Sequence, residues 1–307
     1  MNILITGITG FLGTNLFNKF LLSSNFNIFV LAKRNESKTL DKRILKRCTV
    51  IESDFVNDDV SNLLPTEIDV LLHLAWCGAN GTEKGLVESQ NKNLSILHFI
   101  YKVIKNIKVK KIIGIGSISE FSYLRLNDKD GILSPTLLYG KYKTEVKKRL
   151  LTYCARHDID FKWLRLSSIY SLDLKNDTVL TYALRSLNEH LDCYFGPCLN
   201  YYNFILVDDV CNAIFKFVSS KIISKKHTFS ISSNMSLRLW EYLKIIGTVY
   251  GMENKIHTNS RNDDGTVFLK KDFECSHTIN YIGEFETSNF NENIKKIYNN
   301  YSRNKNE

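Results

Sequence analysis

The sequence predicts an α/β protein in which a Rossmann-type, doubly wound parallel sheet precedes a smaller C-terminal α/β substrate lobe. Two observations lead to this class. Short apolar runs typical of buried strands alternate with longer amphipathic stretches through the first half of the chain, as in a parallel sheet covered by helices on both faces. The chain also opens with a short apolar strand that runs straight into three glycines and then into a helical pattern.

Gly7, Gly10 and Gly13 follow this first strand at intervals of three residues. Gly7 permits a tight turn, Gly10 lets the backbone approach a pyrophosphate, and Gly13 lets the next helix pack close to the strand. The N–H groups and the positive dipole end of that helix favour a phosphate. The spacing differs from the Gly-x-Gly-x-x-Gly dinucleotide motif, and a structural turn without a ligand is the alternative interpretation.

The other elements follow from runs of apolar residues and from helical spacing. Strands are predicted at residues 27–32, 49–52, 69–75, 111–115 and 160–166, and long helices at 86–105 and 138–156. Residues 172–203 have mixed periodicity, 204–210 lead into a helix that ends near 219, and short strands are predicted near 228–231 and 266–269. We expect a dinucleotide-binding domain over 1–169, completed by about 204–220, a substrate lobe from 170–203 and 221–300, and a polar tail at 301–307.

Composition excludes several classes of protein. The 307 residues are 44% hydrophobic and 24% charged, as in an ordinary globular protein. No apolar run reaches the ~18 residues that span a bilayer, and the first residues lack the features of a signal peptide, so we expect no membrane and a cytoplasmic location. The seven cysteines are scattered without a C-x-x-C pair, which predicts neither a metal site nor a disulfide framework.

The net charge of +9 has two interpretations. The lysines are spread along the chain without interleaved aromatic residues, so no nucleic-acid partner is expected. Positive potential also suits small anionic substrates such as nucleotide phosphates.

Tyr139 and Lys143 form the second informative pattern. At a spacing of four they share one face of the predicted helix. A tyrosine has an ordinary pKa of about 10, and a nearby ammonium group stabilises its phenolate and brings it into the range of acid–base catalysis. Ser117 ends the preceding strand, where its hydroxyl can bond a substrate carbonyl or alkoxide. A lone Y-x-x-x-K pair also occurs as surface decoration, but its position one helix after Ser117 favours catalysis.

With these motifs the chain resembles the extended short-chain dehydrogenases/reductases that act as nucleotide-sugar epimerases, dehydratases and ketoreductases. The resemblance covers nearly the whole length, and its further motifs are Asp54-Phe55, His73-Leu74-Ala75, Asn93, and residues 164–170 and 203–210. It implies that Tyr139 transfers a proton to or from a sugar hydroxyl while hydride moves between nicotinamide and the same carbon. It also implies that Lys143 holds the nicotinamide ribose and that a homodimer forms through helices 86–105 and 138–156.

The candidate site residues fall into three groups. The catalytic residues are Ser117, Tyr139 and Lys143. The residues expected to bind the cofactor are Gly7, Thr9, Gly10, Phe11, Leu12, Gly13, Lys33, Arg34, Asp54, Phe55, Leu74, Ala75, Asn93, Tyr139, Lys143 and Ser168. The residues expected to contact the substrate are Trp76, Ser117, Ser119, Tyr139 and Asn203.

Two departures from the family pattern narrow the function. Resembling dehydratases carry an Asp-Glu pair directly after the Ser117 position, whereas this chain has Ile118-Ser119 there, so dehydration is not expected. Many resembling epimerases carry Arg-Asp where this chain has Tyr202-Asn203. The usual contact with the substrate diphosphate then needs a substitute, for which the candidates are Arg185, Arg238 and Arg261.

The end of the second strand bears on cofactor choice. NAD-specific sites place a carboxylate there for the ribose 2′-hydroxyl, whereas this chain has Lys33-Arg34, and cations suit a 2′-phosphate. The sequence therefore favours NADP(H), with NAD(H) possible and a solvated strand end as the alternative interpretation.

Three functions are consistent with these residues. The leading hypothesis is NADPH-dependent reduction of a nucleotide-linked 4-keto-6-deoxysugar. The second is a nucleotide-sugar 4-epimerase with tightly bound NAD. The third is a non-catalytic nucleotide-sensing protein on the same fold, which ranks low because such proteins typically lose the tyrosine or the lysine, and this chain keeps both. The nucleotide, the sugar, the product stereochemistry and the oligomeric state stay open.

Overall fold

The computed structural model describes residues 1–21, 25–126, 133–222, 224–263 and 265–304. Its centre is a seven-stranded sheet whose strands all pair in parallel. In spatial order the strands are β11 (Thr228–Ile231), β6 (Asp160–Leu166), β5 (Lys108–Ser117), β4 (Glu67–His73), β1 (Asn2–Thr6), β2 (Asn27–Lys33) and β3 (Cys48–Ser53). The predicted doubly wound parallel sheet is therefore confirmed.

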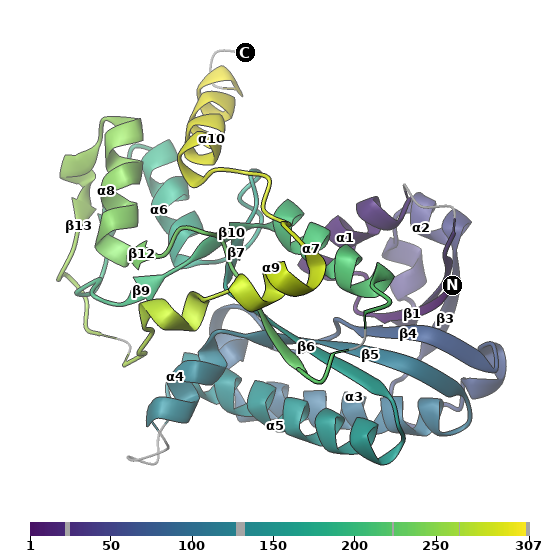
Figure 1. Cartoon of the computed structure of the whole chain (residues 1–307). Helices are drawn as coiled ribbons and strands as arrows, with labels where there is room; N and C mark the ends of the chain where they lie inside the picture. The colour runs from purple at the N-terminus through teal and green to yellow at the C-terminus, as the bar shows by residue number, and fades with distance from the viewer. Residues whose placement is uncertain (22–24, 127–132, 223, 264, 305–307) are drawn as a thin grey trace.

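Helices cover both faces of this sheet (Figure 1). One layer contains α3 (Val87–Lys105) and α5 (Pro135–Arg156), and the other contains α1 (Phe11–Leu21), α2 (Lys42–Arg47), α7 (Val207–Ser219) and α9 (Ser276–Ile282). The pleat of β1 illustrates the division, because Ile3 and Ile5 enter one core and Leu4 enters the other. Burial on both faces explains why the strands are apolar runs without polar alternation.

The lobe that the sequence predicts to bind the substrate lies beyond the carboxyl ends of the strands (Figure 1). Its helices are α6 (Val179–Asn188), α8 (Leu239–Tyr250) and α10 (Phe290–Asn304). Outside the large sheet there are three short strand pairs: β7 (Ser168–Tyr170) with β10 (Phe204–Leu206), β9 (Tyr201–Tyr202) with β12 (Leu237–Arg238), and β8 (Cys193–Tyr194) with β13 (Ile256–His257). The core of the lobe is aromatic, since the rings of Phe204, Tyr242 and Phe290 contact one another.

Short elements complete the chain. They are α4 (Ser119–Leu126) and the 3-10 turns η1 (Glu36–Thr39), η2 (Ser61–Leu63), η3 (Gly81–Gly85), η4 (Glu253–Lys255) and η5 (Lys270–Phe273). No helix among the described residues has the length and apolar character needed to cross a membrane.

The structure differs from the sequence prediction in the second half of the chain. Residues 266–269 form no strand, because the Asn200 side chain and the Ser122 hydroxyl bond their backbone. The excursion at 172–203 contains α6, whose first turn is held by a capping box between Thr178 and Thr181. Strand β11 and helix α9 pack in the sheet domain rather than in the substrate lobe, and α10 extends through Asn304 into the predicted polar tail.

Candidate active site

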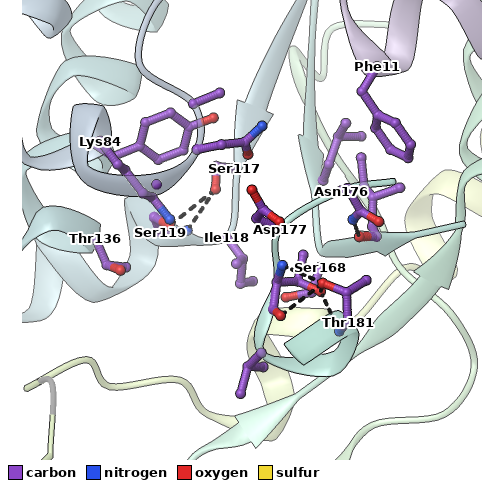
Figure 2. Close-up of a pocket in the computed structure, with 18 of the residues that line it drawn as sticks. Phe11, Lys84, Ser117, Ile118, Ser119, Thr136, Ser168, Asn176, Asp177 and Thr181 are labelled. Atoms are coloured by element: carbon purple, nitrogen blue, oxygen red, sulfur yellow. Dashed lines mark hydrogen bonds between the residues drawn. The ribbon is translucent and has the colours of Figure 1, made fainter. Parts of the chain in front are cut away.

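A cavity of about 1250 Å³ lies at the carboxyl ends of the parallel strands, between the sheet domain and the substrate lobe. We call it the site cavity. Lys84, Ser117 and Ser119 lie on one side of it, and Phe11 and Asn176 on the other (Figure 2). Ligands of open parallel sheets bind at this edge, so the topology itself places the candidate residues around one space.

Most of the site residues predicted from the sequence line the site cavity. They are Gly7, Thr9, Gly10, Phe11, Leu12, Gly13, Lys33, Phe55, Leu74, Ala75, Trp76, Ser117, Ser119, Tyr139, Lys143 and Ser168. The predicted residues Arg34, Asp54, Asn93 and Asn203 are not part of its lining.

Two glycines of the turn after β1, Gly7 and Gly13, leave no room for a side chain. Gly7 has φ +77°, and a Cβ there would lie 2.4 Å from the backbone nitrogen of Ala75. A Cβ at Gly13 would lie 2.4 Å from the carbonyl oxygen of Gly7. A Cβ at Gly10 would meet only the Gly7 carbonyl oxygen, at 3.4 Å. Gly10 therefore faces open space in the site cavity, which is the approach that a pyrophosphate needs.

His73 of the His-Leu-Ala motif ties β4 to β1 beneath the site cavity. Its Nδ1 lies 2.8 Å from the Thr6 hydroxyl, and the backbone nitrogen of Ala75 donates to the same hydroxyl oxygen at 3.3 Å. Burial, together with the nearby Lys143 ammonium, lowers the pKa of His73 to about 3. The imidazole is therefore neutral at physiological pH and has a structural role.

Helix α3 holds the loop that follows β4. The Asn93 side chain accepts from the backbone nitrogen of Cys77 at 2.8 Å and donates to the Cys77 carbonyl at 3.1 Å. Gln90 donates to the Gly78 carbonyl at 2.7 Å and accepts from the Trp76 indole at 3.2 Å. Asn93, which was expected among the cofactor contacts, is buried behind this loop and supports it instead.

Trp76, Tyr139 and Lys143 form an aromatic–cationic cluster. The Lys143 ammonium donates to the Ile115 carbonyl at 2.8 Å and lies 3.5 Å from the centroid of the Trp76 ring. The Trp76 and Tyr139 rings meet edge to face at 5.7 Å, and the Lys143 ammonium is 5.5 Å from the Tyr139 ring centroid. Tyr139 and Lys143 thus share a helix face, as their spacing predicted.

Lys84 lines the site cavity but was not predicted as a site residue from the sequence. Its ammonium lies 4.9 Å from the centroid of the Tyr139 ring and comes from η3. A single lysine in a short 3-10 turn carries no periodic signal, so only the fold brings it to the site.

The two catalytic candidates on α5 have displaced pKa values. Burial lowers the pKa of Lys143 to about 7, although the Glu120 carboxylate opposes this shift. Burial, with the same carboxylate, raises the pKa of Tyr139 well above its ordinary value. The sequence-based expectation that Lys143 brings the pKa of Tyr139 down is therefore wrong for the protein without ligands, because burial dominates and Tyr139 stays protonated at neutral pH.

Helices α4 and α5 make a close contact next to Ser117, the last residue of β5. A Cβ at Gly140 would lie 2.2 Å from the Ser119 carbonyl oxygen, so only glycine lets the two helices approach this closely. The Ser117 hydroxyl donates to the Ser119 hydroxyl at 3.2 Å and accepts from the Ser119 backbone nitrogen at 3.2 Å (Figure 2). The backbone nitrogen of Ser117 donates to Glu120 Oε1 at 2.9 Å.

The end of β2 brings Lys33 to the site cavity and leaves Arg34 outside its lining. Arg34 forms an exposed ion pair with Asp58 at 2.5 Å. Glu36 also lines the site cavity and accepts from the backbone nitrogen of Lys33 at 3.0 Å. Asp54 accepts three backbone N–H groups of its own turn, which lowers its pKa; its side chain thus caps a turn outside the cavity lining.

Asn203 is placed differently from its prediction as a substrate contact. Its side chain is fully buried, accepts from the Ser167 hydroxyl and the Ser233 backbone nitrogen, and donates to the carbonyls of Ser233 and Met235. These bonds tie three segments together beneath the lobe. Because none of its polar atoms faces the site cavity, Asn203 is corrected to a structural residue.

Two of the three substitute arginines lie at the lobe end of the site cavity. Arg185 pairs with Asp177 at 2.7 Å, and Arg261 donates to the Tyr182 hydroxyl at 3.2 Å. Arg238 is not part of the lining and packs over the Tyr201 ring. Among the described residues, no group of three or more His, Cys, Asp or Glu side chains could hold a metal ion.

Burial of Lys143 leads to a prediction about stability. A folded-state pKa of about 7, against 10.5 for a free lysine, means that folding disfavours protonation by about 1.4 kcal/mol per pKa unit. This cost is complete below pH 7 and vanishes as the pH rises toward 10. In cofactor-free protein, Lys143→Met should raise the free energy of unfolding by a few kcal/mol at pH 6 and by less at pH 9. Chemical unfolding at both pH values measures this.

The control is Lys148→Met, at an exposed position of the same helix. It should change stability little at either pH. An equal effect of Lys143→Met at pH 6 and pH 9 would contradict the displaced pKa.

Comparisons with known proteins agree with this geometry. No curated protein matches the sequence. Among solved structures, the chain is similar to UDP-glucose 4-epimerase from Thermotoga maritima, with 16% identity, 100% coverage of both chains and a TM-score of 0.76. It is also similar to UDP-glucuronic acid 4-epimerase from Bacillus cereus in complex with NAD, with 19% identity, coverage of 99% of this chain and 97% of that chain, and a TM-score of 0.75.

A third similar structure is dTDP-glucose 4,6-dehydratase from Bacillus anthracis in complex with NAD, with 17% identity, coverage of 100% and 98%, and a TM-score of 0.72. At these identities the structural likeness establishes the fold. The sequence profile of the NAD dependent epimerase/dehydratase family matches residues 3–248, which is most of the chain. The chain therefore belongs to the NAD-dependent epimerase/dehydratase family, a group of extended short-chain dehydrogenase/reductase enzymes.

Proposed function

We propose that this enzyme reduces a nucleotide-linked 4-keto-6-deoxysugar with NADPH. The observation that carries the proposal is that Ser117, Tyr139 and Lys143 line one cavity, with the Lys143 ammonium 5.5 Å from the centroid of the Tyr139 ring. Reduction of a ketone requires a proton donor for the developing alkoxide, whereas oxidation of a sugar hydroxyl requires a base. Tyr139 holds its proton in the resting protein and is therefore in the protonation state that the first of these tasks requires.

The residues present fit a nicotinamide cofactor. The open face of Gly10 and the start of α1 suit a pyrophosphate, and Lys143 is placed to hold the nicotinamide ribose. When bound, the cofactor supplies the hydride to C4 of the sugar. The Tyr139 hydroxyl then donates its proton to the C4 oxygen, which the Ser117 hydroxyl holds by a hydrogen bond. Trp76 packs edge to face against the Tyr139 ring and helps to fix its orientation.

The lobe end of the site cavity suits the nucleotide part of the substrate. Arg185 and Arg261 both line it, and guanidinium groups bind phosphate oxygens in pairs. We assign them the diphosphate contact that Tyr202-Asn203 does not supply. Dehydration is disfavoured, because Ile118 and Ser119 offer no carboxylate for the removal of water.

A 4-epimerase with tightly bound NAD is the second candidate. The similar structures named above include UDP-sugar 4-epimerases, one of them in complex with NAD, and an epimerase uses the same tyrosine in both directions. A non-catalytic nucleotide sensor is disfavoured, because Tyr139 and Lys143 are both retained and both line the site cavity.

The preference for NADPH is proposed on Lys33, the cation of the β2 end that lines the site cavity. A charge-assisted bond to a 2′-phosphate favours NADPH. Glu36 lines the same region, and its carboxylate repels a phosphate. Lys33 and Glu36 together therefore set the selectivity between NADPH and NADH.

Homodimer formation stays a prediction. Helices α3 and α5 lie together on one face of the sheet (Figure 1). Leu86 and Val87, at the start of α3, are exposed. These helices are the surface through which resembling enzymes pair.

Reduction and epimerisation differ in what happens to the cofactor. We expect stoichiometric loss of absorbance at 340 nm when the protein, NADPH and a nucleotide-linked 4-keto-6-deoxyhexose are mixed. Tyr139→Phe should lower this rate by 10²-fold or more, because general acids contribute about 10²–10⁴-fold. The matched control is Tyr142→Phe, since Tyr142 lies on the same helix and bonds Asn91 outside the site cavity. Constant absorbance with inversion of a nucleotide hexose at C4 would establish the epimerase instead.

Cofactor selectivity has its own test. Dissociation constants of NADPH and NADH, titrated by intrinsic fluorescence, should favour NADPH in the wild type. Lys33→Ala should narrow the ratio by about ten- to a hundredfold, because a charge-assisted bond contributes roughly 1.5–3 kcal/mol. Arg34→Ala should have a smaller effect, since Asp58 already pairs with this guanidinium. Equal affinities in the wild type would refute the preference.

A further inference from the structure

Ser117 and Glu120 make a pair of bonds related to a capping box at the turn from β5 into α4. The Ser117 hydroxyl accepts from the Ser119 backbone nitrogen, while Glu120 Oε1 accepts from the Ser117 backbone nitrogen at 2.9 Å. The sequence Ser-Ile-Ser-Glu is the S-x-x-E signature of this motif. The serine proposed to hold the sugar oxygen thus ends β5 and is tied to the first residues of α4, which begins at Ser119.

The Glu120 carboxylate is fully buried and bonded on both oxygens. Oε1 also accepts from the Trp163 indole at 2.8 Å, and Oε2 accepts from Arg165 at 2.9 and 3.3 Å. Trp163 and Arg165 both lie on β6, the strand beside β5. The carboxylate therefore links the end of the strand that carries Ser117 to its neighbour in the sheet.

The residue before Ser117 is adapted to this carboxylate. A Cβ at Gly116 would lie 2.4 Å from Glu120 Oε1 and 2.2 Å from Trp163 Nε1. Any side chain at this position would displace the carboxylate or the indole, so Gly116 gives both groups access to the end of β5.

We propose that Glu120 is the positioning residue of Ser117, fixing its backbone so that its hydroxyl stands at the sugar oxygen. This inference rests on the proposed function. Breaking a buried ion pair by removing one partner is strongly destabilising, yet such pairs add little net stability compared with apolar packing. Stability alone therefore gives weak reason for a buried carboxylate here. The bond that is specific to this place is the one to the Ser117 amide.

The bond from the Ser117 amide to Glu120 fixes the backbone but leaves the side chain of Ser117 free to rotate. With its backbone held by Glu120, Ser117 can change its hydrogen bonds only by rotation of its side chain. In the absence of substrate the hydroxyl donates to Ser119. When a sugar oxygen arrives, the same rotation redirects the proton to it without any movement of β5. A misplacement of about 1 Å can cost 10²-fold in rate, so this fixation has a catalytic consequence.

A double-mutant cycle tests the proposal. Glu120→Gln keeps the size of the side chain but places an amide NH2 toward Arg165 or toward the Ser117 amide. We expect it to lower kcat of NADPH-dependent reduction by about tenfold to a hundredfold, with a smaller change in KM. In a Ser117→Ala background the same substitution should change kcat by less than about twofold, because the hydroxyl that it positions is gone.

The matched control is Glu145→Gln, which removes an exposed carboxylate paired with Arg149 on α5 and should leave kcat unchanged. The proposal would be overturned if Glu120→Gln lowered kcat by the same factor in the wild-type and Ser117→Ala backgrounds. An unchanged kcat in the wild-type background would also overturn it. If Glu120→Gln does not fold, Trp163→Phe removes one bond to Oε1 while keeping an aromatic ring, and its effect on kcat should likewise vanish in the Ser117→Ala background.

A second readout separates this proposal from the proposed function. Hydrogen exchange of the Ser117 amide, measured in the protein without substrate, should be at least about tenfold slower in the wild type than in Glu120→Gln or Trp163→Phe. Equal exchange rates would overturn the proposal that Glu120 positions Ser117, even if the enzyme is active. If the wild type reduces no keto-sugar, the proposed function fails, while slow exchange that depends on Glu120 still supports the positioning of Ser117.

Discussion

The close approach of the carboxyl ends of β1 and β4 is the constraint on which the site depends. A side chain at Gly7 would overlap the backbone of Ala75, so the two strand ends can touch only through glycine. This contact directs the loop after β4 into the site cavity, where Gln90 and Asn93 hold it from behind. Trp76 then reaches α5 and contacts the Tyr139 ring. A packing requirement in the first turn of the chain thus determines where Trp76 lies beside Tyr139.

Buried charge is the second organising feature. Lys143, which lines the site cavity, and Glu120 and Arg165, which are not part of its lining, are all buried. Each is held by hydrogen bonds that offset part of the desolvation cost. The result is a preorganised polar layer, in which Tyr139 keeps its proton and Lys143 is only partly protonated near neutral pH. Such an environment stabilises charge that develops at a substrate without reorganisation of the protein.

The sequence predicted the features that depend on local spacing. The glycine turn and the Tyr139–Lys143 pair follow from intervals of three and four residues, which a turn and a helix face impose directly. Predictions that depended on distant partners were less successful. Asn203 bonds segments some 30 residues away, and Arg34 turns to Asp58, which no local pattern indicates. Glu120 did carry a local signal, the S-x-x-E motif, but its partners on β6 become visible only in the fold.

The central claim is that the site cavity transfers hydride from a freely exchanging nicotinamide cofactor to C4 of a nucleotide-linked sugar. The most direct measurement supplies NADPH with two deuterium atoms at C4 of the nicotinamide, together with either a nucleotide-linked 4-keto-6-deoxyhexose or a nucleotide hexose, followed by mass spectrometry and NMR of the product. The account predicts one deuterium per product molecule, located at C4 of the sugar. A product inverted at C4 without deuterium would contradict it, because the hydride would then have remained within a tightly bound cofactor.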